Sequence, residues 1–178
     1  MVHKHRPHNL PGHTDLIGEE GVSKTDARIR ALGAVDEASA ALGLAKSLIH
    51  NTGHKQLLAT CQADLSMIMA VLAGWGKADK AAETTSSTIS QVLAGLENAI
   101  SGLEEQIVLP TQFILSGNTP GSGALALART IVRRAEREVV GLAQSQASID
   151  VDILQYLNRL STLCFLLEVA ETGAQSST

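Results

Sequence analysis

The chain is organised around Ala128-Arg129-Thr130-Ile131-Val132-Arg133-Arg134-Ala135-Glu136-Arg137. At about 100° per residue, a helix here places Arg129, Arg133, Glu136 and Arg137 on one face. Three guanidiniums and one carboxylate on a stripe allow three interpretations: a solvated charged face, ion pairs with a neighbouring subunit, or a cradle for a polyanion, because planar guanidinium forks suit phosphate oxygens. Spacing alone leaves all three open. The apolar residues expected on the packing side are Leu125, Ile131, Val132, Ala135 and Val139.

The composition around this stretch indicates an all-α protein. Hydrophobic residues make up 44% of the 178 residues and aromatic residues only 2%, so Ala and Leu must fill the core. Such a core is typical of helices packed on helices, in one domain. The net charge of −4 argues against nucleic-acid binding by the chain as a whole. Cys61 and Cys164 are isolated, which predicts neither a disulfide framework nor a metal site.

Apolar periodicity and end signals predict five helices. No apolar run is long enough to span a bilayer and the polar start lacks a signal peptide's apolar core, so we expect a cytoplasmic protein without a membrane partner. Ser23 and Thr119 are the expected N-caps of the first and fourth helices. No strand is expected. We expect an irregular tail and loop over 1–21, a five-helix bundle over 22–171 and a polar tail over 172–178. The helices are expected at about 24–50, 54–73, 85–106, 120–145 and 148–170.

Two acidic residues stand out in the first helix. Asp36 and Glu37 lie mid-helix among apolar neighbours. They are interpreted either as solubilising surface charges or as partners, one of which pairs with an arginine of residues 128–137.

Five segments of the chain, taken in order, carry the sequence pattern of one known protein family. The specific ones are the arginine segment itself and Tyr156-Leu157-Asn158-Arg159-Leu160-Ser161, while the matches in the first helix are weaker alone. With the other segments they cover nearly the whole chain from Thr14 onward. The remaining segments are Val22-Ser23-Lys24 with Gly33-Ala34-Val35-Asp36-Glu37 and Ala41-Leu42-Gly43-Leu44-Ala45, Gln62-Ala63-Asp64-Leu65, and Gln112-Phe113-Ile114-Leu115. Together the five segments resemble the PduO-type ATP:corrinoid adenosyltransferases.

The resemblance implies a homotrimer of five-helix bundles with active sites between subunits. It implies transfer of the 5′-deoxyadenosyl group of ATP, bound with magnesium, to the cobalt of cob(I)alamin, with release of triphosphate. Cobalt(I) is itself the nucleophile, so the protein must position the reactants and stabilise charge on the leaving group. A reductase or a cobalamin-dependent enzyme would be a further partner.

The same resemblance assigns roles to individual residues. Arg133, Arg137 and Lys24 would contact the phosphates, and Glu136 and Asn158 would hold the adenosine part. As an alternative, Asn158 is an ordinary polar residue on an exposed face.

Three further residues complete the catalytic set that the resemblance implies around Arg133. Asp36 and Arg129 would form an ion pair between subunits that shapes the site. Phe113 would sit under the corrin and exclude the lower axial ligand. As an alternative, Phe113 simply plugs the end of the bundle.

One stretch departs from the family pattern. Where the family usually has a Thr-Gly-Asp-x-Gly-Thr phosphate loop, this chain has Pro7-His8-Asn9-Leu10-Pro11-Gly12-His13-Thr14. The prolines remove N–H donors, and Glu19 and Glu20 would repel a triphosphate unless a metal ion lies between. Two other hypotheses therefore stay open beside the enzyme: a non-catalytic relative that binds a corrinoid or nucleotide, and a structural bundle whose arginines only form salt bridges.

Overall fold

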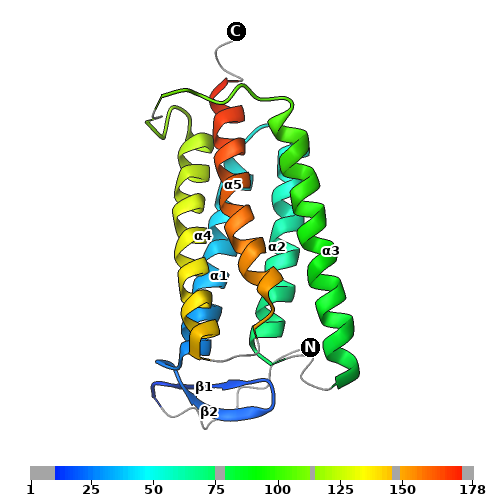
Figure 1. Cartoon of the computed structure of the whole chain (residues 1–178). Coiled ribbons are helices and arrows are strands. Elements are labelled where there is room, and N and C mark those ends of the chain that lie inside the picture. Colours follow the sequence, from blue (N-terminus) through cyan, green and yellow to red (C-terminus); the bar gives the residue numbers. More distant parts are fainter. Residues whose placement is uncertain (1–10, 75–78, 113–114, 146–148, 174–178) are drawn as a thin grey trace.

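Five long helices stand side by side, with a short hairpin across one end (Figure 1). The computed structural model describes residues 11–74, 79–112, 115–145 and 149–173. The expected five-helix architecture is confirmed, with a two-stranded hairpin added to it. In chain order the elements are β1 (His13–Leu16), β2 (Glu19–Ser23), α1 (Ala27–Leu48), α2 (Thr52–Leu72), α3 (Asp79–Glu104), α4 (Pro120–Ser145) and α5 (Val151–Gly173).

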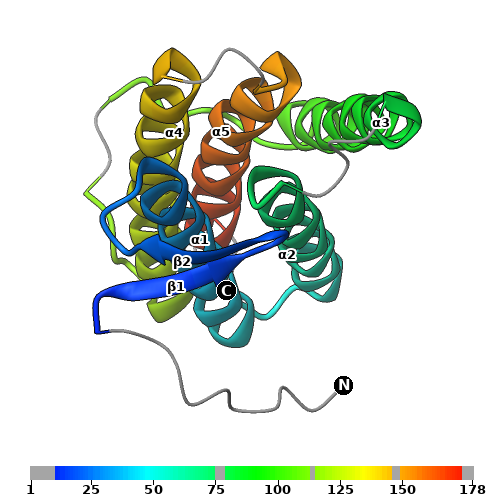
Figure 2. The ribbon, with the colours of Figure 1, turned by 90° about the horizontal axis from the view of Figure 1, so that it is seen from below.

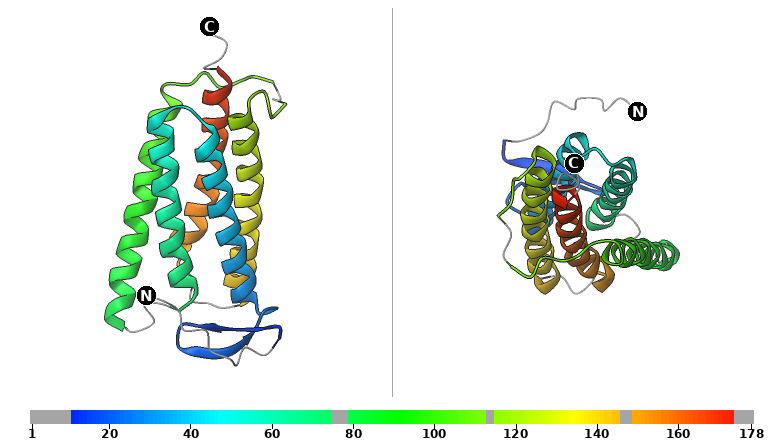
Figure 3. Two further views of the ribbon diagram at one scale, coloured as in Figure 1. Left: turned by 180° about the vertical axis from the view of Figure 1, so that it is seen from behind. Right: turned by 90° about the horizontal axis from the view of Figure 1, so that it is seen from above.

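The helices do not contribute equally to the core. α1 packs most extensively against α4, α4 packs against α5, and α2 packs mainly against α1. Seen from the hairpin end, α3 stands apart beside α5 (Figure 2). The described parts of the connection from α3 to α4 cross the end of the bundle opposite the hairpin (Figure 3). α4 is therefore held between α1 and α5, with one flank turned to each.

Small residues let α1 and α4 approach closely. Ala31, Ala38, Ala128 and Ala135 are fully buried, and small side chains at a helix crossing allow short interaxial distances. A Cβ on Gly121 would lie 3.1 Å from Cγ2 of Ile49 at the end of α1, so a larger residue there would push the helices apart. This contact fixes where α4 begins relative to α1.

The start of α4 is capped as the sequence predicted. The Oγ1 of Thr119 accepts a hydrogen bond of 2.9 Å from the backbone N of Ser122, and Ser122 Oγ accepts one of 2.9 Å from the backbone N of Thr119. The reciprocal pair is a capping box in which serine replaces the usual Glu or Gln.

The starts of the first two helices differ from the expectation. α1 begins at Ala27 rather than Lys24, because the side chain of Asp26, not Ser23, accepts the N–H of Arg28 at 2.8 Å. α2 begins at Thr52 rather than at His54, because the side chain of Asn51 accepts the N–H of His54 at 3.0 Å and caps the helix.

The expectation of no strand was wrong for residues 13–23. β1 and β2 pair antiparallel, with a register shift between Thr14 and Leu16. Gly18 and Gly21 adopt φ values of 77° and 70°, which side chains rarely tolerate, and the carboxylate of Asp15 accepts the N–H of Gly21 at 3.0 Å. Turn geometry rather than apolar alternation therefore makes the hairpin, since among the described residues of its strands only Val22 is buried.

In the part of the chain that the structure describes, no helix combines the length and the apolar character that a bilayer crossing requires.

Candidate functional site

The two flanks of α4 carry different charges in different settings. We call Arg129, Arg133, Glu136 and Arg137 the α5-facing flank, and Arg134 and Glu138 the α1-facing flank. Arg129 and Glu136 contact α5, Arg134 and Glu138 contact α1, and the 100° step between residues places Arg133 and Arg137 on the same side as Arg129.

On the α1-facing flank, each charge has an opposite charge on α1. Arg134 forms an ion pair with Glu37, and Nε of Arg30 lies 3.9 Å from Oε2 of Glu138. All four side chains are between two fifths and two thirds exposed. The sequence hypothesis that Asp36 or Glu37 pairs with an arginine of residues 128–137 is confirmed for Glu37. Exposed pairs of this kind help to align two helices and have no excess charge to offer a ligand.

On the α5-facing flank, two residues are tied to α5. Asn158 Nδ2 donates to Glu136 Oε1 at 2.9 Å. About two turns earlier along α4, Nε of Arg129 lies 3.9 Å from Oε2 of the buried Glu168. The structure thus brings together Glu136 and Asn158, which the resemblance assigned to one role.

Two arginines of the α5-facing flank have no carboxylate partner among the described residues: Arg133, between Arg129 and Glu136, and Arg137, directly after Glu136. Among the described residues, Arg133 and Arg137 form no ion pair, whereas the other arginines there each face a carboxylate. Both are exposed, and Nη1 of Arg137 donates to the backbone oxygen of Arg133 at 3.0 Å. Two guanidiniums one turn apart, both accessible and uncompensated, suit a bound anion with several oxygens.

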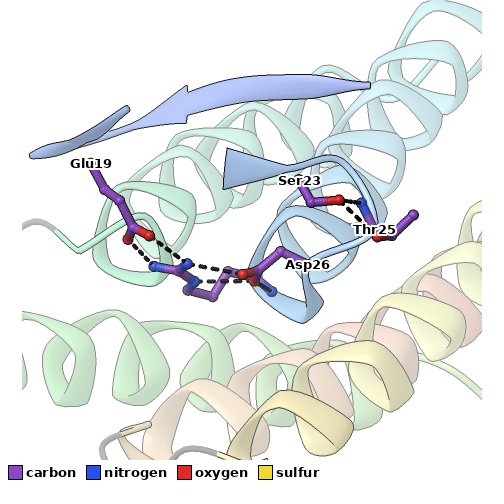
Figure 4. Close-up of polar contacts among 5 residues, drawn as sticks. Glu19, Ser23, Thr25 and Asp26 are labelled. Atoms are coloured by element: carbon purple, nitrogen blue, oxygen red, sulfur yellow. Dashed lines mark hydrogen bonds and ion pairs between the residues drawn. The ribbon is translucent and has the colours of Figure 1, made fainter. Parts of the chain in front are cut away.

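The hairpin is joined to α1 by a three-residue cluster. Figure 4 shows Glu19 and Asp26 on either side of one guanidinium, that of Arg28, which donates to Glu19 at 2.5 and 3.2 Å and to Asp26 at 2.9 and 3.1 Å. The hydrogen bond from Arg28 lowers the pKa of Asp26. Hydrogen bonds to Asp26 and then Glu19 raise the pKa of Arg28.

This cluster changes the interpretation of Glu19. The sequence suggested that Glu19 would repel a triphosphate, but its charge is compensated by Arg28. Its task is to hold β2 against the first turn of α1. Lys24 comes directly after β2. Its backbone N donates to the backbone oxygen of Gly12 at 2.8 Å, and the residue is exposed.

Two predicted site residues are not joined to the others. Asp36 is exposed and pairs with none of the residues that the structure describes, and Arg129 faces Glu168 instead. The prediction placed the Asp36–Arg129 pair between subunits, so a single chain does not test it. Phe113 lies outside the described residues.

Neither of the two buried cysteines is a candidate nucleophile. Burial raises the pKa of Cys61 to about 12 and raises that of Cys164, and a thiolate is the reactive form of cysteine. Tyr156 is fully buried and donates to Asp64 at 2.8 Å, tying α5 to α2. Within the described ranges, no cluster of three or more His, Cys, Asp or Glu side chains could hold a metal ion.

A cavity of about 280 Å³ lies between α2 and α3, away from α4. It contains none of the predicted site residues. Its lining residues are Leu57, Thr60, Cys61, Asp64, Val92, Gly95 and Leu96.

Two residues of structural importance were missed in the sequence. Arg28 anchors the hairpin, and no local pattern distinguishes it from a surface arginine. Glu168 did have a signal, as a lone acid within the apolar run Phe165-Leu166-Leu167-Glu168-Val169.

Comparisons with known proteins agree on one family. The family model described as cobalamin adenosyltransferase matches residues 11–171. The corrinoid adenosyltransferase PduO of Citrobacter freundii is 36% identical over 160 residues, which is 90% of this chain and 47% of that protein. The chain thus spans about half the length of this relative. A corrinoid adenosyltransferase of Mycobacterium tuberculosis is 34% identical over 158 residues, covering 88% of this chain and 81% of that protein.

Solved structures show the same architecture. A variant PduO-type ATP:corrinoid adenosyltransferase from Lactobacillus reuteri, complexed with cobalamin and ATP, superimposes with a TM-score of 0.79 at 29% identity and covers 93% of this chain and 91% of that chain. A second variant of that type from the same organism, complexed with ATP, gives a TM-score of 0.80 at 32% identity, with the same two coverages.

Proposed function

Because the chain belongs to the cobalamin adenosyltransferase family, we propose that it transfers the 5′-deoxyadenosyl group of ATP to the cobalt of cob(I)alamin and releases triphosphate. ATP enters as its magnesium complex. The observation that supports this most is the accessible pair of arginines, Arg133 and Arg137, which lack carboxylate partners among the described residues.

The reaction needs positioning rather than a protein nucleophile. The electron pair of cobalt(I) attacks C5′ of the ribose, a cobalt–carbon bond forms, and the bond from C5′ to the triphosphate oxygen breaks. Negative charge then grows on the departing triphosphate. Preorganised guanidiniums stabilise that charge most where it develops, which is the largest contribution such a site can make.

The side chains divide this work. Arg133 and Arg137 contact the phosphates, and Lys24 adds a third positive charge from the end of the hairpin. Glu136, held by Asn158 at 2.9 Å, keeps an acceptor fixed for the adenosine part. This pairing removes one rotational freedom before ATP arrives, which lowers the entropic cost of binding.

We propose that the complete site forms between subunits of a homotrimer. Among the described residues, the ion pairs between α1 and α4 are Glu37–Arg134 and Arg30–Glu138, and Asp36 takes part in neither. Asp36 can therefore pair with Arg129 of the partner subunit, as in the sequence prediction. Phe113 is proposed to lie against the corrin and exclude its lower axial ligand.

Cobalt(I) must be supplied by reduction, so we also propose a reductase or a cobalamin-dependent enzyme as a transient partner. Both cysteines are free and buried, which fits a reducing compartment such as the cytoplasm.

An anaerobic assay with chemically reduced cobalamin and MgATP tests the proposal. Adenosylcobalamin and triphosphate should form in equal amounts. The second candidate, a non-catalytic corrinoid- or nucleotide-binding relative, is favoured by the prolines at positions 7 and 11 of the altered phosphate loop. Cobalamin binding by calorimetry without product would establish that candidate and exclude the enzyme.

A further inference from the structure

Glu168 is a carboxylate where helix α5 is otherwise apolar. It is 3% exposed and lies next to buried Leu166 and Leu167. An ionised carboxylate is unfavourable in such surroundings unless a cation lies beside it. Among the described residues, the only cation facing it is Arg129 of α4, whose Nε lies 3.9 Å from Oε2 of Glu168.

The guanidinium of Arg129 has an inner and an outer edge. Its Nε is buried and forms no hydrogen bond with a described residue, while the side chain as a whole is 34% exposed. The inner edge therefore faces Glu168, and the terminal nitrogens reach the surface. Cys164, one turn before Glu168 on α5, is buried, and burial raises the pKa of its thiol, so it adds no negative charge of its own to this region.

We propose that Glu168 is a positioning residue for Arg129. It holds the Nε edge so that the two terminal nitrogens project from the seam between α4 and α5, ready to receive Asp36 of the partner subunit. The proposal rests on the proposed function, which includes that pair between subunits. Arg129 then bridges an inner carboxylate of its own chain and an outer carboxylate of the next.

The contact of Arg129 with the partner subunit depends on its contact with Glu168. Without the charge of Glu168, no carboxylate among the described residues faces the buried Nε, so the guanidinium gains rotational freedom and meets the partner in many orientations. Rotamer-rich side chains that are fixed in advance lose less entropy on association. Glu168 should therefore affect assembly and the geometry of the site more than it affects the stability of the single chain.

The test uses Glu168→Gln, which keeps the shape and removes the charge, with Glu171→Gln as its matched control. Glu171 is also buried, lies one turn further along α5 and faces His54 at 3.4 Å. Sedimentation equilibrium should show assembly weakened about tenfold by Glu168→Gln and less than about twofold by Glu171→Gln. With Glu168→Gln, kcat should fall about tenfold while the KM for ATP stays within about twofold.

A double-mutant cycle with Arg129→Gln separates the two proposals. If Glu168 acts through Arg129, Glu168→Gln should add less than about twofold once Arg129 is Gln. Effects that multiply would overturn the positioning role. If Arg129→Gln changes assembly and activity while Glu168→Gln changes neither, only the inference about Glu168 fails. If Arg129→Gln changes neither, the proposed pair between subunits fails.

A measurement on the unaltered protein covers the case in which Glu168→Gln does not fold. The side-chain Nε–H of Arg129, assigned by its absence in Arg129→Lys, should exchange with solvent at least about tenfold more slowly than that of exposed Arg133. Equal exchange rates would contradict a guanidinium held by its inner edge.

Discussion

The two flanks of α4 carry the same types of charged residue but use them differently. On the α1-facing flank, Arg134 and Glu138 meet Glu37 and Arg30, and the charges cancel. On the α5-facing flank, carboxylates meet only Arg129 among the three described arginines, so positive charge is left over at Arg133 and Arg137. An arginine with a carboxylate aligns helices; an arginine without one is available to a ligand. Consecutive residues, Arg133 and Arg134, fall on opposite sides of this division.

The largest expected effect compares these two neighbours. Arg133→Ala should lower kcat/KM by about 30- to 1,000-fold, or about 2–4 kcal/mol, because a charged contact to the leaving triphosphate is lost. Arg134→Ala removes only an exposed ion pair and should cost less than about threefold. Steady-state kinetics of both variants, with circular dichroism to check folding, make the measurement. Equal losses would erase the distinction between the flanks.

The next effect concerns the hydrogen bond that fixes Glu136. Asn158→Ala removes the 2.9 Å contact and should raise the KM for ATP about five- to tenfold, in line with about 1–1.5 kcal/mol for one hydrogen bond. Because the contact holds bound ATP before and during reaction, kcat should change little. Glu37→Gln on the other flank is the control and should leave the KM unchanged. A raised KM in the control would mean that both flanks bind the nucleotide.

A smaller effect measures the structural flank directly. A double-mutant cycle of Arg134→Ala and Glu37→Ala should give a coupling free energy of unfolding of about 0.2–1 kcal/mol, as expected for an exposed pair. The same cycle with Arg133 in place of Arg134 should give none within error. Urea denaturation supplies the free energies. Coupling between Arg133 and Glu37 would show that the two arginines are not separated by the helix.

The smallest effect extends the comparison to the hairpin. Arg28, which holds the hairpin to α1, resembles Arg134 in having carboxylate partners, Glu19 and Asp26. Hydrogen bonding to Arg28 lowers the pKa of Asp26 from its ordinary 3.8. The resulting stabilisation is therefore present above about pH 4 and is lost as pH falls through the lowered value. The protection factors of the backbone amides of residues 19–23 against hydrogen exchange, taken relative to the intrinsic rate at each pH, should fall below pH 4. Asp26→Asn should remove that pH dependence. A hairpin indifferent to acid would show that the cluster does not hold it.

The flank itself was predictable because it depends on angular spacing alone. Arg129, Arg133, Glu136 and Arg137 fall on one side of any regular helix, and Thr119 followed by proline marks where that helix starts. Glu37 was also predicted, as one of two acids in the first helix that could pair with an arginine of residues 128–137. That prediction needed only the location of both charges on long helices of one bundle.

The hairpin could not be predicted, because its information is in backbone geometry. Residues 13–23 lack alternating apolar residues, and the chain reverses through glycines at positive φ and the side chain of Asp15. The same limit applies to pairing. Sequence spacing does not predict the pair of Arg28 with Glu19 or the pair of Arg129 with Glu168. Each pair joins two elements whose relative position is set by packing.

The central claim is that the complete site forms between subunits, which predicts that the arginine flank of one subunit acts together with Lys24, at the hairpin end, of another. It is tested most directly by mixing two variants, Lys24→Ala and Arg133→Ala, each of which should lose at least about tenfold in adenosylcobalamin formation. After dissociation and reassembly at equal concentration, random mixing leaves about one site in four with both residues intact, so about a quarter of the wild-type activity should return. A mixture no more active than the separate variants, although hybrid oligomers are seen by native mass spectrometry, would place the whole site within one chain and contradict the account.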